Sequence, residues 1–86
     1  MQAVREQLVQ LSVRANGINS TLQTMQRSQA ASGLNLSSKF TDPAGLMNSY
    51  IQGAGEALKD GDPAIAKSFL DKAERQVAIL EKLLNR

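Results

Sequence analysis

The residues of this chain that could do chemistry are few, and they fall in two short runs. Asp60 and Asp62 flank Gly61, so their carboxylates could hold a calcium ion, and residues 37–39 (Ser-Ser-Lys) bring two hydroxyl groups close to an amine. A calcium loop needs further oxygen ligands in alternation and a distant glutamate, and this pattern is missing. We therefore interpret the aspartates as helix caps in a turn, and residues 37–39 as ordinary polar loop residues.

The rest of the composition offers little for catalysis or metal binding. The 86 residues include no cysteine and no histidine, which removes the commonest zinc ligands and the usual general base. The run 53–55 (Gly-Ala-Gly) lies inside a helical pattern, whereas a phosphate-binding loop joins a strand to a helix. We expect a protein that is not an enzyme, with no cofactor, no metal site and no small-molecule substrate.

Charge and hydropathy limit the other partners. The net charge is only +2, from ten basic and eight acidic residues, and the basic residues form no dense cluster. This balance does not favour a nucleic acid as the partner. No apolar run approaches the ~20 residues of a membrane-spanning helix, so we expect no membrane span. The lack of cysteine leaves the cellular compartment open.

A seven-residue apolar rhythm predicts a long first helix over about residues 2–31. Its hydrophobic residues recur at alternating spacings of four and three, which places them along one face of a helix. They are Val4, Leu8, Leu11, Ala15, Ile18, Leu22 and Met25. The dipeptide Asn16-Gly17 is a common turn former, but the rhythm keeps its phase across it. We expect one continuous helix, with a bend at this dipeptide left open, and Gly33 as its end.

Two further helices follow from capping signals. Asp42 and Pro43 can start a helix over about residues 43–59, because aspartate caps free amides and proline needs no amide partner in the first turn. Residues 60–63 (Asp-Gly-Asp-Pro) end that helix and start a third over about residues 63–85. Two helices joined by so short a turn pack antiparallel.

Together these signals predict an all-α fold, a three-helix up-down-up bundle that forms a single domain over residues 1–86. A domain of this size fits either a whole protein or one part of a longer one. The middle helix, of about 17 residues, would span roughly 25 Å, against about 45 Å for the first helix. Part of the apolar face of the first helix would then lack cover, which indicates a contact surface for a protein partner or for self-association.

The candidate contact residues are apolar and lie off the main stripe or in the connection after the first helix. They are Val9, Val13, Leu34, Leu36 and Phe40. Val9 and Val13 lie one helical turn apart, so they form either a second apolar strip or a wider core face. The other three are too apolar for a solvated linker, and we expect them to fold back over one end of the bundle.

One segment resembles a known structural motif. Residues 61–62 (Gly-Asp), followed by Ala66, Leu70 and Ala73, are spaced as in the turn and second helix of a tetratricopeptide repeat. In that family, small residues mark the crossing of two helices. The resemblance covers about residues 47–74, a single unit, whereas repeat proteins stack several. It implies an antiparallel helical hairpin and protein–protein contact, and it transfers no binding residue to this chain.

Three classes of function are open from the sequence. The first is a non-catalytic helical module, interaction or structural, that acts through protein–protein contact. The alternative is a nucleic-acid-binding module that uses the polar face of the first helix, where Arg5, Arg14 and Arg27 lie among amide side chains. Its affinity would fall steeply with salt. The third, an enzyme, would need a polar pocket with converging carboxylates, for which the sequence offers no signal.

Overall fold

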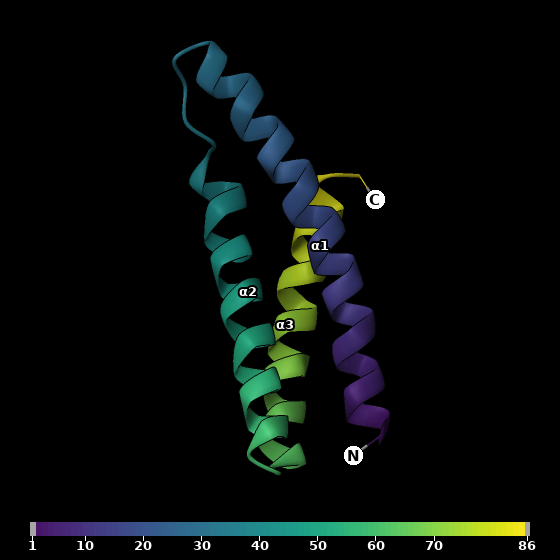
Figure 1. The fold of residues 1–86 in the computed structure, drawn as a ribbon. Helices are drawn as coiled ribbons and strands as arrows, with labels where there is room; N and C mark the ends of the chain where they lie inside the picture. The colour runs from purple at the N-terminus through teal and green to yellow at the C-terminus, as the bar shows by residue number, and fades with distance from the viewer. Residues whose placement is uncertain (1, 86) are drawn as a thin grey trace.

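A computed structural model describes residues 2–85 as three α-helices joined by short connections (Figure 1). Helix α1 runs over Gln2–Ala31, α2 over Ser38–Lys59 and α3 over Pro63–Leu83. α1 and α3 run in one direction and α2 in the other, so the predicted all-α, up-down-up three-helix bundle is confirmed. The bundle is elongated, with principal extents of 46 × 22 × 16 Å.

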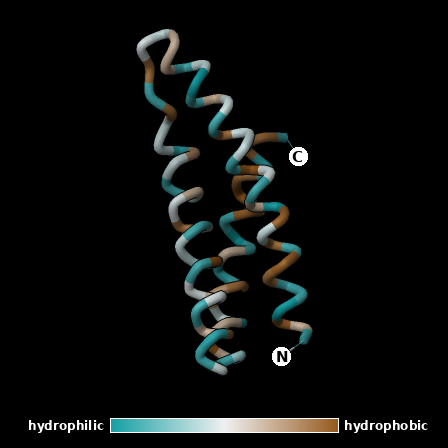
Figure 2. Tube along the Cα trace, in the orientation of Figure 1, coloured by the Kyte–Doolittle hydropathy of each residue, from teal (hydrophilic) through white to brown (hydrophobic). Residues whose placement is uncertain are grey.

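The core is built from aliphatic side chains and alanine. Hydrophobic and hydrophilic positions alternate along every helix, as a bundle with one buried face per helix requires (Figure 2). The buried residues of the α1 stripe are Leu11, Ala15, Ile18 and Leu22. The buried residues of α2 and α3 are Ala44, Met47, Ala54, Ala57, Leu58, Ala66, Leu70, Ala73, Val77 and Leu80. The many alanines let the helix axes approach closely, and the larger aliphatic side chains fill the remaining space.

α1 is continuous through Asn16 and Gly17, as predicted. Ala15 and Ile18, on either side of the dipeptide, are both buried. Asn16 itself is exposed, so the turn-forming residue lies on the outer face. Packing of the buried stripe therefore outweighs the cost of about 1 kcal/mol that a glycine adds to a helix interior.

The end of α1 follows the predicted glycine signal. Gly33 has a φ of +76°, the left-handed conformation that favours glycine. Its amide donates to the carbonyl oxygen of Ala30 at 3.0 Å, and the amide of Leu34 donates to that of Gln29 at 2.8 Å. These two bonds satisfy carbonyl groups that a helix end otherwise leaves free.

α2 begins at Ser38, so the predicted span of 43–59 was wrong at its start. Ser37 is the cap, and its hydroxyl oxygen accepts a hydrogen bond from the amide of Lys39 at 3.3 Å. Pro43 consequently lies inside the helix rather than at its first position. The added first turn is held by tertiary packing, because Phe40 is half-buried against the core.

The earlier start of α2 changes which part of α1 is covered. α2 has 22 residues and α3 has 21, against 30 for α1, so the middle helix is not the shortest. The upper end of α1 extends beyond both α2 and α3, and the connection that leads into α2 runs beside it (Figure 1). The C-terminal end of α1 therefore has no helix of the described chain beside it, and the connection over residues 32–37, whose Leu36 packs against the core, lies there instead (Figure 1).

The turn between α2 and α3 confirms the capping interpretation. Gly61 has a φ of +77°, and the amide of Asp62 donates to the carbonyl oxygen of Ala57 at 2.8 Å. The carboxylate of Asp62 accepts a hydrogen bond from the amide of Ile65 at 3.2 Å, which caps α3. Pro63 follows at the first helical position.

α3 ends at Leu83, two residues before the end of the predicted span 63–85. Asn85 takes a φ of +59°, a left-handed conformation that asparagine tolerates better than most residues. The helix therefore stops where the backbone turns away from the helical path.

α2 and α3 pack together more extensively than either packs on α1. Phe69 of α3 lies against Gly53 of α2, where the glycine leaves room for the ring. The Tyr50 ring lies 6.4 Å from that of Phe69, measured between centroids, and Lys72 Nζ lies 5.9 Å from the Tyr50 centroid. The hairpin of α2 and α3 is thus the best-packed part of the bundle.

Candidate functional site

The five predicted contact residues fall into two environments. Val9 and Val13 on α1 are 61% and 67% exposed, and Leu34 in the connection is 60% exposed. Leu36 and Phe40 are half-buried and pack against the core. The expected fold-back of the connection over the bundle thus holds for Leu36 and Phe40 but not for Leu34.

Val9 and Val13 form a second apolar strip on α1. Their exposure excludes the alternative that they widen the core face. The strip belongs to the N-terminal half of α1, which is richer in hydrophobic positions than the C-terminal half (Figure 2). Two valines one turn apart on a solvated helix face are an apolar surface without a partner in the described part of the chain.

A shallow groove lies beside Val9, between the N-terminal half of α1 and the C-terminal end of α2. We call it the α1–α2 groove. It is lined by Arg5, Leu8, Val9, Gly55, Leu58 and Lys59. Because α1 and α2 run antiparallel, residues near the start of the chain meet residues near the end of the second helix. The groove therefore joins positions that are about fifty residues apart in sequence.

The apolar lining of the groove follows from small and half-buried residues. Gly55 contributes no side chain, and a Cβ atom there would meet no neighbouring heavy atom within 4 Å. Leu8 is half-buried and packs against a small cluster formed by Ala57, Leu58 and Ala66. The open position at Gly55 thus exposes the edge of a leucine cluster that a larger residue would cover.

Two positive charges border the groove. Arg5 comes from α1 and Lys59 from α2, and both residues are exposed. None of the described lining residues is acidic. Within residues 2–85, the salt bridges involve other cations, Arg14 and Lys67. The groove therefore combines an apolar floor with cations that have no ion-pair partner among the described residues.

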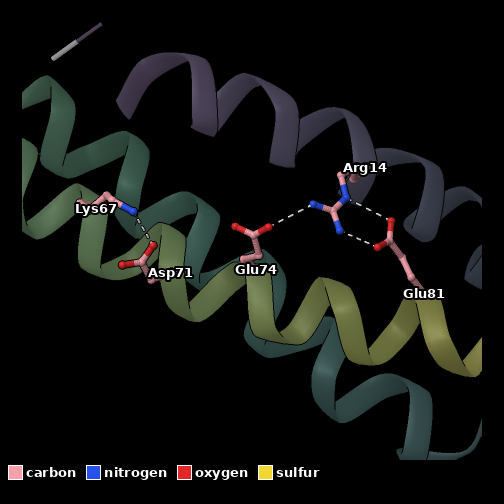
Figure 3. A network of polar contacts seen from close by, with 5 residues as sticks. All are labelled: Arg14, Lys67, Asp71, Glu74 and Glu81. Atoms are coloured by element: carbon pink, nitrogen blue, oxygen red, sulfur yellow. Dashed lines mark hydrogen bonds and ion pairs between the residues drawn. The ribbon is translucent and has the colours of Figure 1, made fainter. Parts of the chain in front are cut away.

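Arg14 shows the contrasting case of a cation used inside the bundle. Its Nε donates to the carboxylate of Glu81 at 3.1 Å and its Nη2 to the other oxygen of the same group at 2.5 Å (Figure 3). A third contact reaches Glu74 at 3.5 Å. The hydrogen bonds that Arg14 donates to Glu81, together with the negative charge of that carboxylate, raise the pKa of Arg14 above its ordinary value. This bidentate ion pair links α1 to α3.

The polar face of α1, which carries the nucleic-acid hypothesis, is partly engaged within the bundle. Arg14 is bound to α3 as described, and Asn19 exchanges two hydrogen bonds with Asn48 of α2, at 2.9 and 3.2 Å. Arg5 and Arg27 remain exposed on this helix. The nucleic-acid hypothesis stays a prediction, and fewer groups of this face are free to contact phosphates.

A second surface feature lies on the other side of α2, at the turn into α3. We call it the acidic hollow. It is lined by Gly53, Glu56, Ala57, Asp60, Asp62, Ile65 and Phe69. Ile65 stands at this hollow and is 50% exposed. The hollow contains three carboxylates. No group of three acidic residues within residues 2–85 is arranged to hold a metal ion.

Two of the residues that were considered for chemistry from the sequence are helix caps in the structure. Ser37 caps α2 and Asp62 caps α3. Asp60 is exposed beside the acidic hollow. No helix within residues 2–85 is long and apolar enough to cross a membrane.

Sequence reasoning missed most of the groove. Val9 was predicted as a contact residue, whereas Arg5 was considered only for nucleic-acid binding, and Gly55 and Lys59 were assigned to no contact surface. A signal was present on α2, because Gly55, Leu58 and Lys59 share one helix face at spacings of three and four. Their meeting with Arg5 depends on how the helices are aligned, which the sequence pattern does not state.

Comparisons with protein-family models, with curated proteins and with solved structures found no match to this chain.

Proposed function

We propose that this chain is a non-catalytic helical module that binds another protein chain through the α1–α2 groove and the adjoining strip of Val9 and Val13. The observation that carries this proposal is the exposure of the two valines next to a groove with an apolar floor. Full burial of one such side chain is worth about 1.5–3 kcal/mol. A partner that covers both valines and the leucine edge would gain several kcal/mol.

The surroundings of the groove have the layout of a protein interface. An apolar centre formed by Leu8, Val9 and Leu58 is bordered by the charged Arg5 and Lys59. Protein interfaces have such an apolar centre and a polar rim. The surface is carried by two regular helices, so little conformational entropy is lost when a partner docks.

Site-specific photo-crosslinking in the native cells tests the proposal. A photoreactive amino acid is placed at Val9, at Val13 or, as the control, at Ile79, which is exposed but lies on α3 outside the groove. We expect a discrete crosslinked protein species from positions 9 and 13 and none from position 79. Equal crosslinking from all three positions, or none from 9 and 13 in a folded chain, would overturn the proposal.

A further inference from the structure

We propose that the chain that occupies the α1–α2 groove is a second copy of this protein, which docks through its acidic hollow. The inference rests on the proposed function, because it names the partner for the same groove. Both surfaces are present on one molecule, so the contact joins the groove of one copy to the hollow of the next.

Charge complementarity is the first argument. The groove presents Arg5 and Lys59 and no acidic residue among its described lining residues. The hollow presents Glu56, Asp60 and Asp62 and no basic residue among its own. None of these five side chains takes part in the salt bridges found within residues 2–85. Opposite charges that take part in no salt bridge within residues 2–85 steer the two surfaces together and fix their register.

The apolar residues of the two surfaces are the second argument. Ile65 is exposed at the hollow, and Val9 is exposed at the groove. When the surfaces meet, Ile65 can be covered by the leucine floor of the groove. Val9 can then lie in the hollow, against the edge lined by Ile65 and Phe69. Each surface thus supplies an exposed aliphatic side chain and a shallow apolar recess, and the contact buries both.

The position of the two surfaces determines the kind of assembly. Gly55, Leu58 and Lys59 occupy one face of α2, whereas Glu56 and Asp60 face the hollow on another side. When the groove of one copy binds the hollow of another, the resulting dimer still has one unoccupied groove and one unoccupied hollow. Further copies can therefore add, into a ring where the rotation between copies closes and into an open filament where it does not. A symmetric groove-to-groove dimer is disfavoured, because it would bring four cations together.

Sedimentation equilibrium on the intact chain is the first test. We expect association that increases with protein concentration, with an apparent dissociation constant that is at least roughly tenfold higher in about 0.5 M salt than in about 0.05 M salt. A chain that stays monomeric up to about 1 mM at low salt would overturn the inference.

Charge-reversal variants give the decisive test. The groove variant carries Arg5→Glu and Lys59→Glu, and the hollow variant carries Glu56→Lys and Asp60→Lys. All four positions are exposed, and Asp62 is left unchanged because it caps α3. Each variant alone should sediment as a monomer, whereas an equimolar mixture should associate, since each groove-to-hollow contact between the two different variants pairs unlike charges. Failure of the mixture to associate would overturn the inference.

A matched control and a second readout separate this inference from the proposed function. The control variant Arg27→Glu with Lys39→Glu changes the net charge as much as the groove variant does but leaves the groove intact, so it should associate like the natural chain. Circular dichroism confirms that every variant keeps its helices.

If the natural chain is monomeric while positions 9 and 13 crosslink to a different protein, the proposed function stands and the second copy is excluded as the partner.

Discussion

The ring of Phe69 lies against the backbone of Gly53, so closely that a Cβ atom at Gly53 would stand 3.1 Å from three carbon atoms of the ring. That separation is shorter than an ordinary van der Waals contact between carbon atoms. The glycine therefore sets how near α3 can come to α2 at this crossing. In the sequence this position belongs to a Gly-Ala-Gly run inside a helical pattern, and the structure shows that it makes room for an aromatic ring.

The close contact predicts different effects for two glycine-to-alanine substitutions in α2. Gly45→Ala should raise the free energy of unfolding by about 0.5–1 kcal/mol, because its new Cβ meets no atom within 4 Å. Gly53→Ala should gain at least about 0.5 kcal/mol less, because the Phe69 ring must move. Urea unfolding followed by circular dichroism measures both. The prediction is wrong if the two substitutions stabilise equally, or if a Phe69→Leu background leaves their difference unchanged.

The pair of Arg14 and Glu81 should contribute measurably to the docking of α1. Arg14→Gln should lower the free energy of unfolding by about 0.5–1 kcal/mol, since the pair is bidentate but partly exposed. A double-mutant cycle with Glu81→Gln isolates the coupling free energy, which should shrink in about 1 M salt. Arg27→Gln, a change at an exposed arginine outside the α1–α3 contact, serves as the control. A coupling indistinguishable from zero at low salt would contradict the expectation.

The two aspartates of the α2–α3 turn should differ in their effect on stability. Asp62→Ala removes the hydrogen bond that caps α3 and should lower the free energy of unfolding by about 1 kcal/mol. Asp60→Ala, two residues earlier, should change it by less than about 0.5 kcal/mol, because this exposed side chain caps no helix start. Thermal and urea unfolding of both variants test this, and equal losses would argue against the capping role.

The pH dependence of Asp71 follows from its contact with Lys67. A hydrogen bond from Lys67, at 2.7 Å, lowers the pKa of Asp71 below its ordinary value of 3.8 (Figure 3). A carboxyl group with a lowered folded pKa stabilises the fold above its unfolded value and loses this effect as the pH falls through the folded value. Lys67→Met should therefore raise the pKa of Asp71, measured by NMR titration of its carboxyl carbon. Lys59→Met should leave it unchanged, and a shift of the same size in both variants would refute the assignment.

The fold followed from local signals wherever those signals acted alone. The apolar stripe of α1 keeps its phase across the Asn16-Gly17 dipeptide, and the sequence at residues 60–63 lacks the further ligands of a calcium loop, so a continuous helix and a capped turn were predicted and both were confirmed. The start of α2 was predicted wrongly, because Asp42 and Pro43 were interpreted as the helix start and residues 37–39 as loop, whereas Ser37 is the cap. The earlier start is supported by the packing of Phe40 against the core, and such tertiary contacts are not visible in a local pattern.

The candidate surface was predicted less well than the fold. Val9 and Val13 could be identified from spacing, because an apolar pair off the main stripe has to lie somewhere on the helix surface. The groove itself needs Arg5 and Lys59 to meet across two helices, and this depends on the axial alignment of α1 and α2. Alignment is set by the whole core, so one sequence alone does not reveal which distant residues become neighbours.

The packing of Tyr50 on Phe69 decides what spectroscopy can report about this protein. Tyr50 is the sole tyrosine in a chain without tryptophan, so near-ultraviolet emission comes from the α2–α3 hairpin alone. Departure of α1 would leave that emission largely unchanged while the far-ultraviolet helical signal declined. If the melting curve from tyrosine emission and the melting curve from the far-ultraviolet signal do not superimpose, the α2–α3 hairpin stays folded after α1 has detached.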